Sequence, residues 1–146
     1  MNAATEFDLG PLTWVKGEID LALTRAVEAL VQHELNGDAT QLRFCRTHVH
    51  QVNGALSIVG LDGVTQVTES LEALLSALEE QRLQFTAEIS ITLTQAIAAI
   101  RKYLDDLVAG EPNQPLRLFL VYSVLATARG LSSCSPADLF FPDLSL

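Results

Sequence analysis

Aromatic residues and the residues that make turns are scarce in this sequence. Of its 146 residues, 6% are aromatic, 5 are proline and 8 are glycine, whereas 49% are hydrophobic. A β-sandwich or barrel needs frequent turns, and a disordered chain lacks so large a hydrophobic fraction. The composition therefore predicts an all-α fold packed through aliphatic side chains. A single domain of this length buries a core without help from disulfides or a metal.

Basic residues are also few, with 9 Lys and Arg against 18 Asp and Glu and a formal net charge of -9. Binding to a phosphate backbone needs many cations, so nucleic acid is excluded as a partner. The longest apolar run, residues 118–126, is far shorter than the ~20 residues that span a bilayer. The start of the chain has neither the basic nor the apolar segment of a secretory signal. We therefore expect a cytoplasmic protein that does not enter the membrane.

The sequence offers little metal, redox or nucleotide chemistry. Cys45 and Cys134 lack metal-type spacing, and Cys45 falls on an apolar helix face, where a buried thiol is expected. His48 and His50 look like a metal pair, but on a helix their side chains diverge by about 200° and cannot share one ion. No Gly-rich phosphate loop is present, so the chain has no recognisable means of binding ATP.

Hydrophobic residues recur every three or four positions in five blocks that are bounded by helix start and stop residues. Asp38 or Thr40, Asp62 and Thr86 are suitable N-caps, and a glycine follows most of the blocks. The connection at residues 60–61 is so short that the second and third helices must be antiparallel neighbours. The predicted helices span residues 12–35, 40–59, 62–81, 86–109 and 116–129.

The last helix and the tail differ from the rest of the chain. The segment LRLFLVYSVLA is apolar almost all round, so this helix is either packed on several sides or partly covered by another chain. Two prolines in SPADLFFPDLSL predict an extended tail, whose Phe140 and Phe141 are expected to pack back on the bundle. The expected organisation is an N-terminal extension (1–11), a helical bundle (12–130) and a tail (131–146) that packs on the bundle or leads to a following domain.

The second predicted helix combines one apolar stripe with a polar face that contains His50. At 100° per residue, His50 lies about 130° from the centre of the stripe and is expected to face water. Residues three, four and seven positions away share its face. The stripe consists of Leu42, Cys45, Val49, Val52, Leu56 and Val59, and the polar face of Arg43, Arg46, Asn53, Gly54 and Ser57.

Gly54 is unexpected within a helix, where glycine costs about 1 kcal/mol relative to alanine. It lies one turn from His50, where a side chain would crowd the imidazole, so a glycine keeps a ring nitrogen accessible to another protein. Neutral imidazole in water is available as a nucleophile. Two other interpretations remain open: Gly54 permits close approach of another helix, and His50 with its arginines is an ordinary exposed surface.

The run His50-Gln51-Val52-Asn53-Gly54 resembles the signature of histidine phosphotransfer (HPt) domains, a helical histidine followed four residues later by glycine, commonly His-x-x-Lys-Gly. The segments FDLGPLTWV, HQVNGAL, PLRLFLVYSVLATARG and PADLFFPDLS extend the resemblance over nearly the whole chain. Together they resemble the amino-terminal HPt-like domain of the chemosensory hybrid histidine kinases that control type IV pili, the ChpA or PilL type, and the related scaffold protein FimL.

The resemblance implies an up-and-down four-helix bundle with an additional long N-terminal helix and an extended C-terminal tail. It implies that His50 exchanges a phosphoryl group with the aspartate of a response-regulator receiver domain, which holds Mg²⁺, and that this domain needs no cofactor of its own. A histidine kinase core, in the same or another polypeptide, and pilus-system scaffold proteins are the other implied partners.

One residue departs from the HPt pattern, because Asn53 replaces the usual lysine and brings no charge. Arg46, with Arg43 nearby, is expected to supply a positive charge and to favour docking of an acidic receiver pocket. A bundle that has lost the transfer chemistry would instead serve as a scaffold or interaction module, and this alternative stays open.

Overall fold

The computed structural model describes residues 9–131 and 136–139 of the chain. Within these residues the chain forms helices and no strand, as the composition predicts. Two short 3-10 helices, η2 (Pro115–Leu118) and η3 (Pro136–Leu139), lie on either side of the last α-helix in the sequence. The α-helices are α1 (Leu9–Asn36), α2 (Ala39–Val59), α3 (Asp62–Glu79), α4 (Ala87–Val108) and α5 (Phe119–Ala128).

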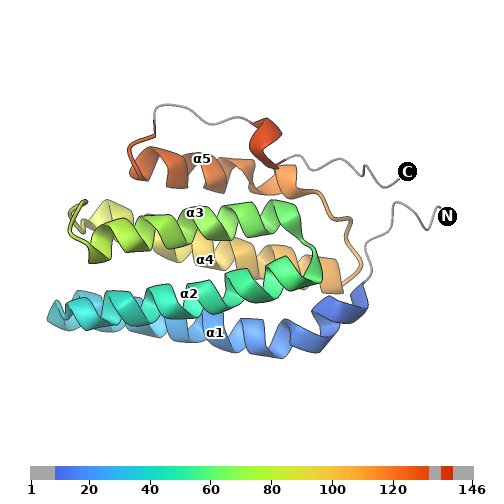
Figure 1. Cartoon of the computed structure of the whole chain (residues 1–146), viewed down its shortest axis with the longest axis horizontal. Helices are drawn as coiled ribbons and strands as arrows, with labels where there is room; N and C mark the ends of the chain where they lie inside the picture. The colour runs from blue at the N-terminus through green and yellow to red at the C-terminus, as the bar shows by residue number, and fades with distance from the viewer. Residues whose placement is uncertain (1–8, 132–135, 140–146) are drawn as a thin grey trace.

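Helices α1 to α4 form a bundle, and α5 lies outside it (Figure 1). Both α1 and α3 contact α2 and α4, so the four helices close a ring. Helix α5 packs on α3 and α4, on the side away from α1 and α2 (Figure 1). The predicted helical bundle is confirmed, whereas an additional N-terminal helix is not, because α1 is itself a member of the ring.

Local sequence sets the ends of most helices. The side chain of Asp38 accepts a hydrogen bond from the Thr40 backbone N–H at 2.9 Å and caps α2. Thr86 caps α4 in the same way, by accepting a hydrogen bond from the Ile89 N–H at 3.2 Å. Gly60 ends α2 with a φ of 88°, in the left-handed region that glycine adopts without strain. These ends agree closely with the sequence prediction.

Three helix boundaries differ from the prediction. Helix α1 begins at Leu9 rather than at residue 12, with Pro11 in its first turn, where a missing N–H loses no hydrogen bond. Helix α3 ends at Glu79 rather than at residue 81, because Gln81 has a φ of 62° and cannot continue a helix. The last predicted helix begins as η2 and becomes α-helical only at Phe119.

Part of the C-terminal tail is helical rather than extended. Residues 136–139 form η3, in which Pro136 occupies the first position that suits its fixed φ. Leu139 is buried, and η3 contacts α3. Phe140, Phe141 and Cys134 lie outside the described residues, so their predicted environments stay predictions.

The core is aliphatic and continuous through the bundle. Helix α3 is buried on several sides because it contacts α2, α4 and α5. Each fully buried Leu or Val contributes roughly 1.5–3 kcal/mol relative to an exposed one. The predicted stripe of α2 is confirmed, since Leu42, Cys45, Val49, Val52 and Leu56 are buried and Val59 is partly buried. None of the helices in the described part of the chain combines the length and the apolar character that a bilayer crossing requires.

Candidate functional site

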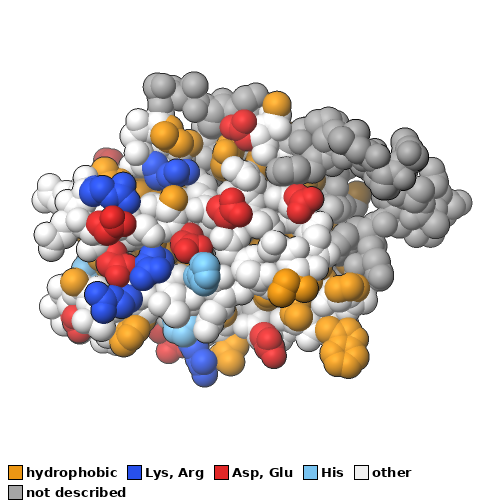
Figure 2. Space-filling view, viewed as in Figure 1, with side chains coloured by type: hydrophobic (Ala, Val, Ile, Leu, Met, Phe, Trp, Pro, Cys, Tyr) orange, Lys and Arg blue, Asp and Glu red, His pale blue; other side chains and the backbone are white. Residues whose placement is uncertain are grey.

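His50 stands on the exposed side of α2, as its position relative to the apolar stripe predicts. Its side chain is 70% exposed, while Val49 and Val52 beside it in the sequence are buried. In the space-filling view, a histidine lies at the surface with acidic and basic side chains gathered next to it (Figure 2). The imidazole is therefore accessible to another protein.

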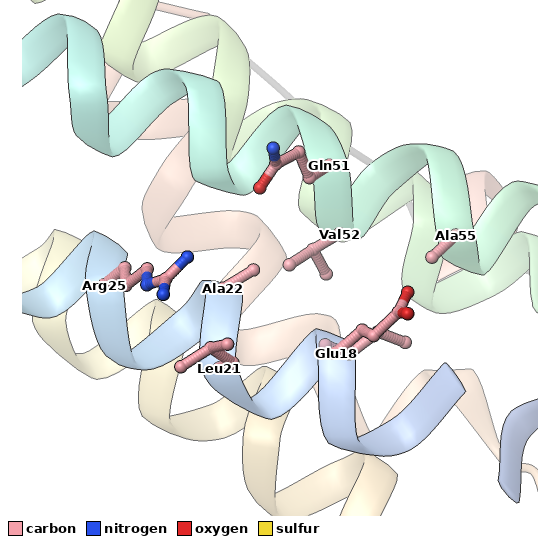
Figure 3. Close-up of a pocket in the computed structure, with 8 residues that line it drawn as sticks. Glu18, Leu21, Ala22, Arg25, Gln51, Val52 and Ala55 are labelled. Carbon is pink, nitrogen blue, oxygen red and sulfur yellow. The ribbon is translucent and has the colours of Figure 1, made fainter. Parts of the chain in front are cut away.

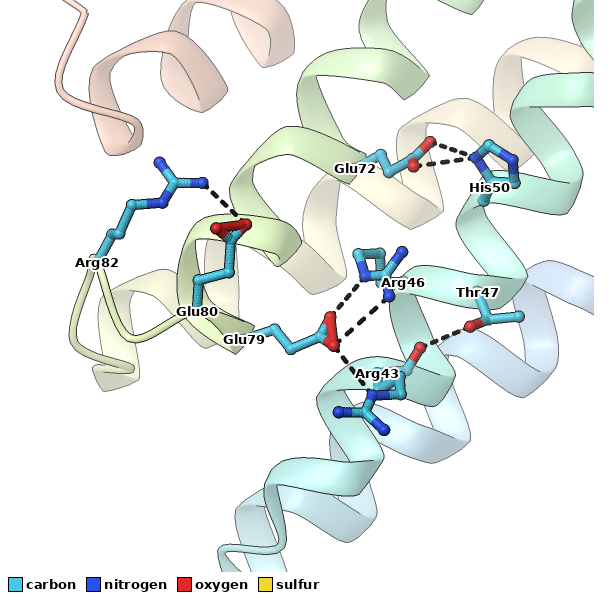
Figure 4. A network of polar contacts seen from close by, with 8 residues as sticks. All are labelled: Arg43, Arg46, Thr47, His50, Glu72, Glu79, Glu80 and Arg82. Carbon is cyan, nitrogen blue, oxygen red and sulfur yellow. Dashed lines mark hydrogen bonds and ion pairs between the residues drawn. The ribbon is translucent and has the colours of Figure 1, made fainter.

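Glu72, on α3, holds one nitrogen of the imidazole. Nδ1 of His50 lies 3.0 Å from Oε2 and 3.1 Å from Oε1 of Glu72. A carboxylate only accepts hydrogen bonds, so Nδ1 must carry the proton in this contact. In the neutral ring the lone pair is then on Nε2, which points away from Glu72 (Figure 4). The contact thus fixes both the orientation and the tautomer of His50.

Asn53 contacts Glu72 rather than providing a charge at the imidazole. Its Nδ2 donates to Oε1 of Glu72 at 3.2 Å, and its Oδ1 is buried with no hydrogen-bond partner in the described residues. The carboxylate that orients His50 is therefore itself positioned by α2. Asn53 acts on the imidazole through Glu72.

The two arginines predicted to share the face of His50 both contact Glu79, near the end of α3. Arg46 donates from Nε to Oε2 at 2.5 Å, and Arg43 donates from Nε to Oε1 at 3.1 Å (Figure 4). The Arg46 hydrogen bond is the main cause that lowers the pKa of Glu79, and Arg43 adds to it. Both arginines of the expected basic island are thus paired with one carboxylate that the sequence prediction did not include, and it balances half of their charge.

Gly54 faces open space. Among the described residues, a Cβ placed on it would meet no atom within 4 Å, apart from its chain neighbours and the local helix backbone. None of the helices that the structure describes therefore uses Gly54 for a close approach, contrary to the alternative of a helix–helix contact within the bundle. Ser57, predicted for the same face, is exposed one turn further along α2. We call the surface formed by Arg46, His50, Asn53, Gly54 and Glu72 the His50 face.

Other features near His50 do not contribute catalytic groups. His48 is half-buried, as predicted, and its Nδ1 lies 3.3 Å from Oε1 of Gln51. A groove of about 340 Å³ between α1 and α2 is lined by Glu18, Arg25 and Gln51 among others, but not by His50 (Figure 3). No group of three or more His, Cys, Asp and Glu side chains in the described residues is arranged to hold a metal ion.

Glu72 and Glu79 are the site residues that the sequence analysis missed. A usable signal was present, because the second and third helices were predicted to be antiparallel with a turn at residues 60–61. Leu61 lies midway between His50 and Glu72, so the two positions must face each other across such a hairpin. Glu79 lies opposite Arg43 by the same symmetry.

Comparison with known families agrees with this geometry. The model of the Hpt domain family matches residues 12–108, which include nearly all of α1 and the whole of α2, α3 and α4. Comparison with curated proteins gives no match. Hpt domains transfer phosphoryl groups through a histidine and exchange them with receiver domains and kinases. Because the match covers most of the chain and its four bundle helices, the chain belongs to the Hpt domain family.

Proposed function

We propose that His50 is the phosphorylated histidine of this Hpt domain and that its Nε2 accepts the phosphoryl group. The contact between Nδ1 and Glu72 carries the proposal, because it keeps the proton on Nδ1 and leaves the lone pair on the exposed nitrogen. Glu72 is a positioning residue that also balances the positive charge gained by the ring. Asn53 in turn positions Glu72.

The transfer step is balanced without loss of a proton from the ring. The Nε2 lone pair attacks the phosphorus of an aspartyl phosphate on a receiver domain, and an N–P bond forms. The bond between phosphorus and the aspartate oxygen breaks, and that oxygen keeps the electron pair as a carboxylate. Nδ1 retains its proton, so the ring becomes cationic beside Glu72. The reverse step returns the group, with Mg²⁺ held by the receiver domain.

The test is phosphoryl transfer from receiver domains of the same genome, each phosphorylated with labelled acetyl phosphate. The wild-type chain should gain acid-labile label, and His50→Gln should gain none. Glu72→Gln keeps an oxygen that accepts from Nδ1 but loses the charge, so transfer should slow about tenfold, equivalent to ~1.4 kcal/mol. His48→Gln is the matched control and should be labelled normally. Label that persists in His50→Gln would contradict the assignment.

We also propose that the domain serves a cytoplasmic chemosensory two-component system that controls type IV pili. The support is the resemblance of four sequence segments to hybrid kinases of the ChpA or PilL type and to FimL. Two of these segments, PLRLFLVYSVLATARG and PADLFFPDLS, lie beyond the residues that the Hpt family model matches, so the general Hpt fold does not account for them. Chromosomal His50→Gln should abolish twitching motility, and His48→Gln should not. Normal motility of both strains would contradict this assignment.

An apolar face that runs from η2 along α5 favours a second candidate function, that of a scaffold or interaction module. Leu116, Leu120 and Val124 are 50%, 75% and 43% exposed, whereas Tyr122 and Leu125 are buried against the bundle. An apolar face of this kind is typical of a protein contact. Light scattering after size exclusion, with and without pilus-system scaffold proteins, tests it. A chain that stays monomeric and binds receiver domains alone would exclude the scaffold.

A further inference from the structure

Arg46 lies between two acidic side chains, Glu79 and Glu72. Its Nε donates to Oε2 of Glu79 at 2.5 Å, and its Nη2 lies 3.5 Å from Oε1. The pKa of Arg46 is raised, mainly by the hydrogen bond to Glu79 and further by attraction to Glu72 and Glu80. Arg46 therefore interacts with the carboxylate that holds the His50 ring, although its direct contacts are with Glu79 (Figure 4).

Arg46 and His50 are one helical turn apart, about 6 Å along the axis. Helical side chains lean toward the N-terminus, so the ring of His50 extends over the turn that carries Arg46. Residues at this spacing are neighbours on a helix surface. The Arg46 side chain is 31% exposed, which leaves the guanidinium room to change rotamer. It can therefore reach a group attached to the ring.

A phosphoryl group on Nε2 would add negative charge to a site that does not compensate it. The ring contacts Glu72, which is already negative, and Glu72 in turn accepts a hydrogen bond from Asn53, which is neutral. Phosphoryl oxygens form short, charge-assisted hydrogen bonds with guanidinium groups. Arg46 is the basic side chain one turn before His50 on the same face, so it is the nearest such donor along α2.

Glu79 keeps a partner when Arg46 leaves it. Arg43 donates from Nε to Oε1 of Glu79 at 3.1 Å, so one charged hydrogen bond to this carboxylate remains. An unpaired carboxylate at this partly buried position, 16% exposed, would oppose the exchange. The second arginine removes that cost.

We propose that Arg46 changes partner when His50 is phosphorylated, leaving Glu79 to bind an oxygen of the phosphoryl group while Arg43 stays with Glu79. This inference rests on the proposed phosphorylation of His50. Arg46 then supplies the positive charge that Asn53 does not. In the unphosphorylated domain the Arg46 guanidinium is instead paired with Glu79, between α2 and α3.

The equilibrium between the domain and a phosphorylated receiver domain measures the effect. Arg46→Gln should lower the ratio of phosphorylated His50 to phosphorylated receiver aspartate about 5–10-fold. Arg46→Lys keeps the charge but loses the planar fork and should lower the ratio about twofold. Glu79→Gln releases Arg46 and should raise the ratio about twofold. Circular dichroism of each variant checks that the helices are retained.

Arg43→Gln is the matched control. It removes the same charge from the same helix and from the same carboxylate, but Arg43 lies two turns from His50 rather than one. Because Arg43 only keeps Glu79 paired during the exchange, its loss should lower the ratio by about twofold, clearly less than the loss of Arg46.

Phosphorus NMR of the phosphorylated domain separates a direct contact from a structural role. A guanidinium beside the phosphoryl group favours its dianion, so the last protonation of that group should occur at higher pH in Arg46→Gln, by about half a unit or more. Arg43→Gln leaves Arg46 in place and should shift this titration by less than half as much.

Two results would overturn the exchange: transfer ratios that are equal in Arg46→Gln and Arg43→Gln, or an unchanged phosphoryl titration in Arg46→Gln. Failure of the proposed function has a different signature, because the wild-type domain itself would then remain unlabelled.

Discussion

Two glycines in neighbouring helices, Gly54 in α2 and Gly63 in α3, have opposite surroundings. A Cβ on Gly63 would lie 2.2 Å from Cβ and 2.3 Å from Cγ of Pro115, whereas a Cβ on Gly54 would meet nothing within 4 Å. The chain itself fills the space over Gly63, where η2 and η3 contact α3. The space over Gly54 is left free. A helical glycine can therefore accommodate either a contact within the chain or, as the sequence predicts for Gly54, the approach of another protein.

The surroundings of Gly63 contrast with the His50 face, because other segments of the chain pack against this glycine, and we call them the η2 junction. It comprises Gly63, Tyr103, Asn113, Pro115 and Arg117. The Tyr103 hydroxyl donates to Oδ1 of Asn113 at 2.6 Å, and the Arg117 guanidinium lies 5.5 Å from the centre of the Tyr103 ring. Tyr103 is 2% exposed and His50 is 70% exposed, so one region maintains packing and the other is open to a partner.

The largest expected effect comes from adding one methyl group to each glycine. Gly63→Ala should lower the free energy of unfolding by about 2–3 kcal/mol, because the new Cβ overlaps Pro115 and the proline ring must move. Gly54→Ala should raise it by about 0.5–1 kcal/mol, because alanine favours the helix and meets no neighbour. Urea unfolding followed by circular dichroism measures both. Similar changes in the two variants would remove the distinction between the regions.

The η2 junction should lose stability in alkali. Burial raises the pKa of Tyr103 from 10.0 to about 12. The folded protein therefore keeps the phenol protonated where the unfolded chain ionises, so the contribution of Tyr103 is complete below pH 10 and is lost as pH rises toward 12. The loss should be about 2 kcal/mol.

Tyr103→Phe is the control for the alkaline loss. It should be less stable at neutral pH by about 1 kcal/mol, because the hydrogen bond to Asn113 is gone, and it should lack the alkaline decline. An equal decline in this variant would assign the effect to another group.

A large side chain at Gly54 should leave the fold intact but slow phosphoryl transfer. Gly54→Met should fold as the wild type does, while a side chain leaning over the preceding turn obstructs the ring and slows transfer about 5–10-fold, or ~1–1.4 kcal/mol. Gly17→Met is the matched control, since Gly17 is an exposed α1 glycine whose added Cβ would also meet nothing within 4 Å. Unimpaired transfer by Gly54→Met would show that the open space has no role in docking.

The smallest expected effect is a loss of stability in acid that comes from Glu79, beside the His50 face. Hydrogen bonds from Arg46 and Arg43 lower the pKa of Glu79 below its ordinary value of 4.5. Its stabilisation is therefore present above pH 4.5 and is lost as pH falls through the lower folded value. Glu79→Gln should reduce this loss by about 0.5–1 kcal/mol, as expected for a partly exposed pair. Acid titration of unfolding checks it, with Glu80→Gln as the control for a neighbouring exposed carboxylate.

The sequence predicted the features that depend on residues close together along the chain. Helix caps such as Asp38 and Thr86 act within one turn, so their positions were found. The exposure of His50 follows from the period of the apolar stripe on its own helix. The start of α1 was missed because a proline in a first helical turn can occupy more than one position there.

The side-chain pairs between helices were not predicted, although the symmetry of the predicted hairpin about Leu61 would have indicated those of His50 and Arg43. The pairing of Arg43 and Arg46 with Glu79 requires the register of α2 against α3, and the sequence alone suggested free cations. The overlap at Gly63 requires η2 to lie against α3, although Pro115 is far away in the sequence. Helical periodicity identifies the face that a residue occupies, but it does not identify the residue opposite.

The length of the turn at Gly60 and Leu61 sets the register of α3 against α2, and with it the contacts of His50. An inserted residue would rotate the following helix by about 100° relative to α2. That rotation would separate Glu72 from the imidazole and Glu79 from both arginines at once, even if the hydrophobic core repacked. The longer connections at residues 80–86 and 109–114 lie outside the α2–α3 hairpin, and their lengths do not set this spacing. Insertions in those two connections should therefore impair phosphoryl transfer far less than an insertion at residues 60–61.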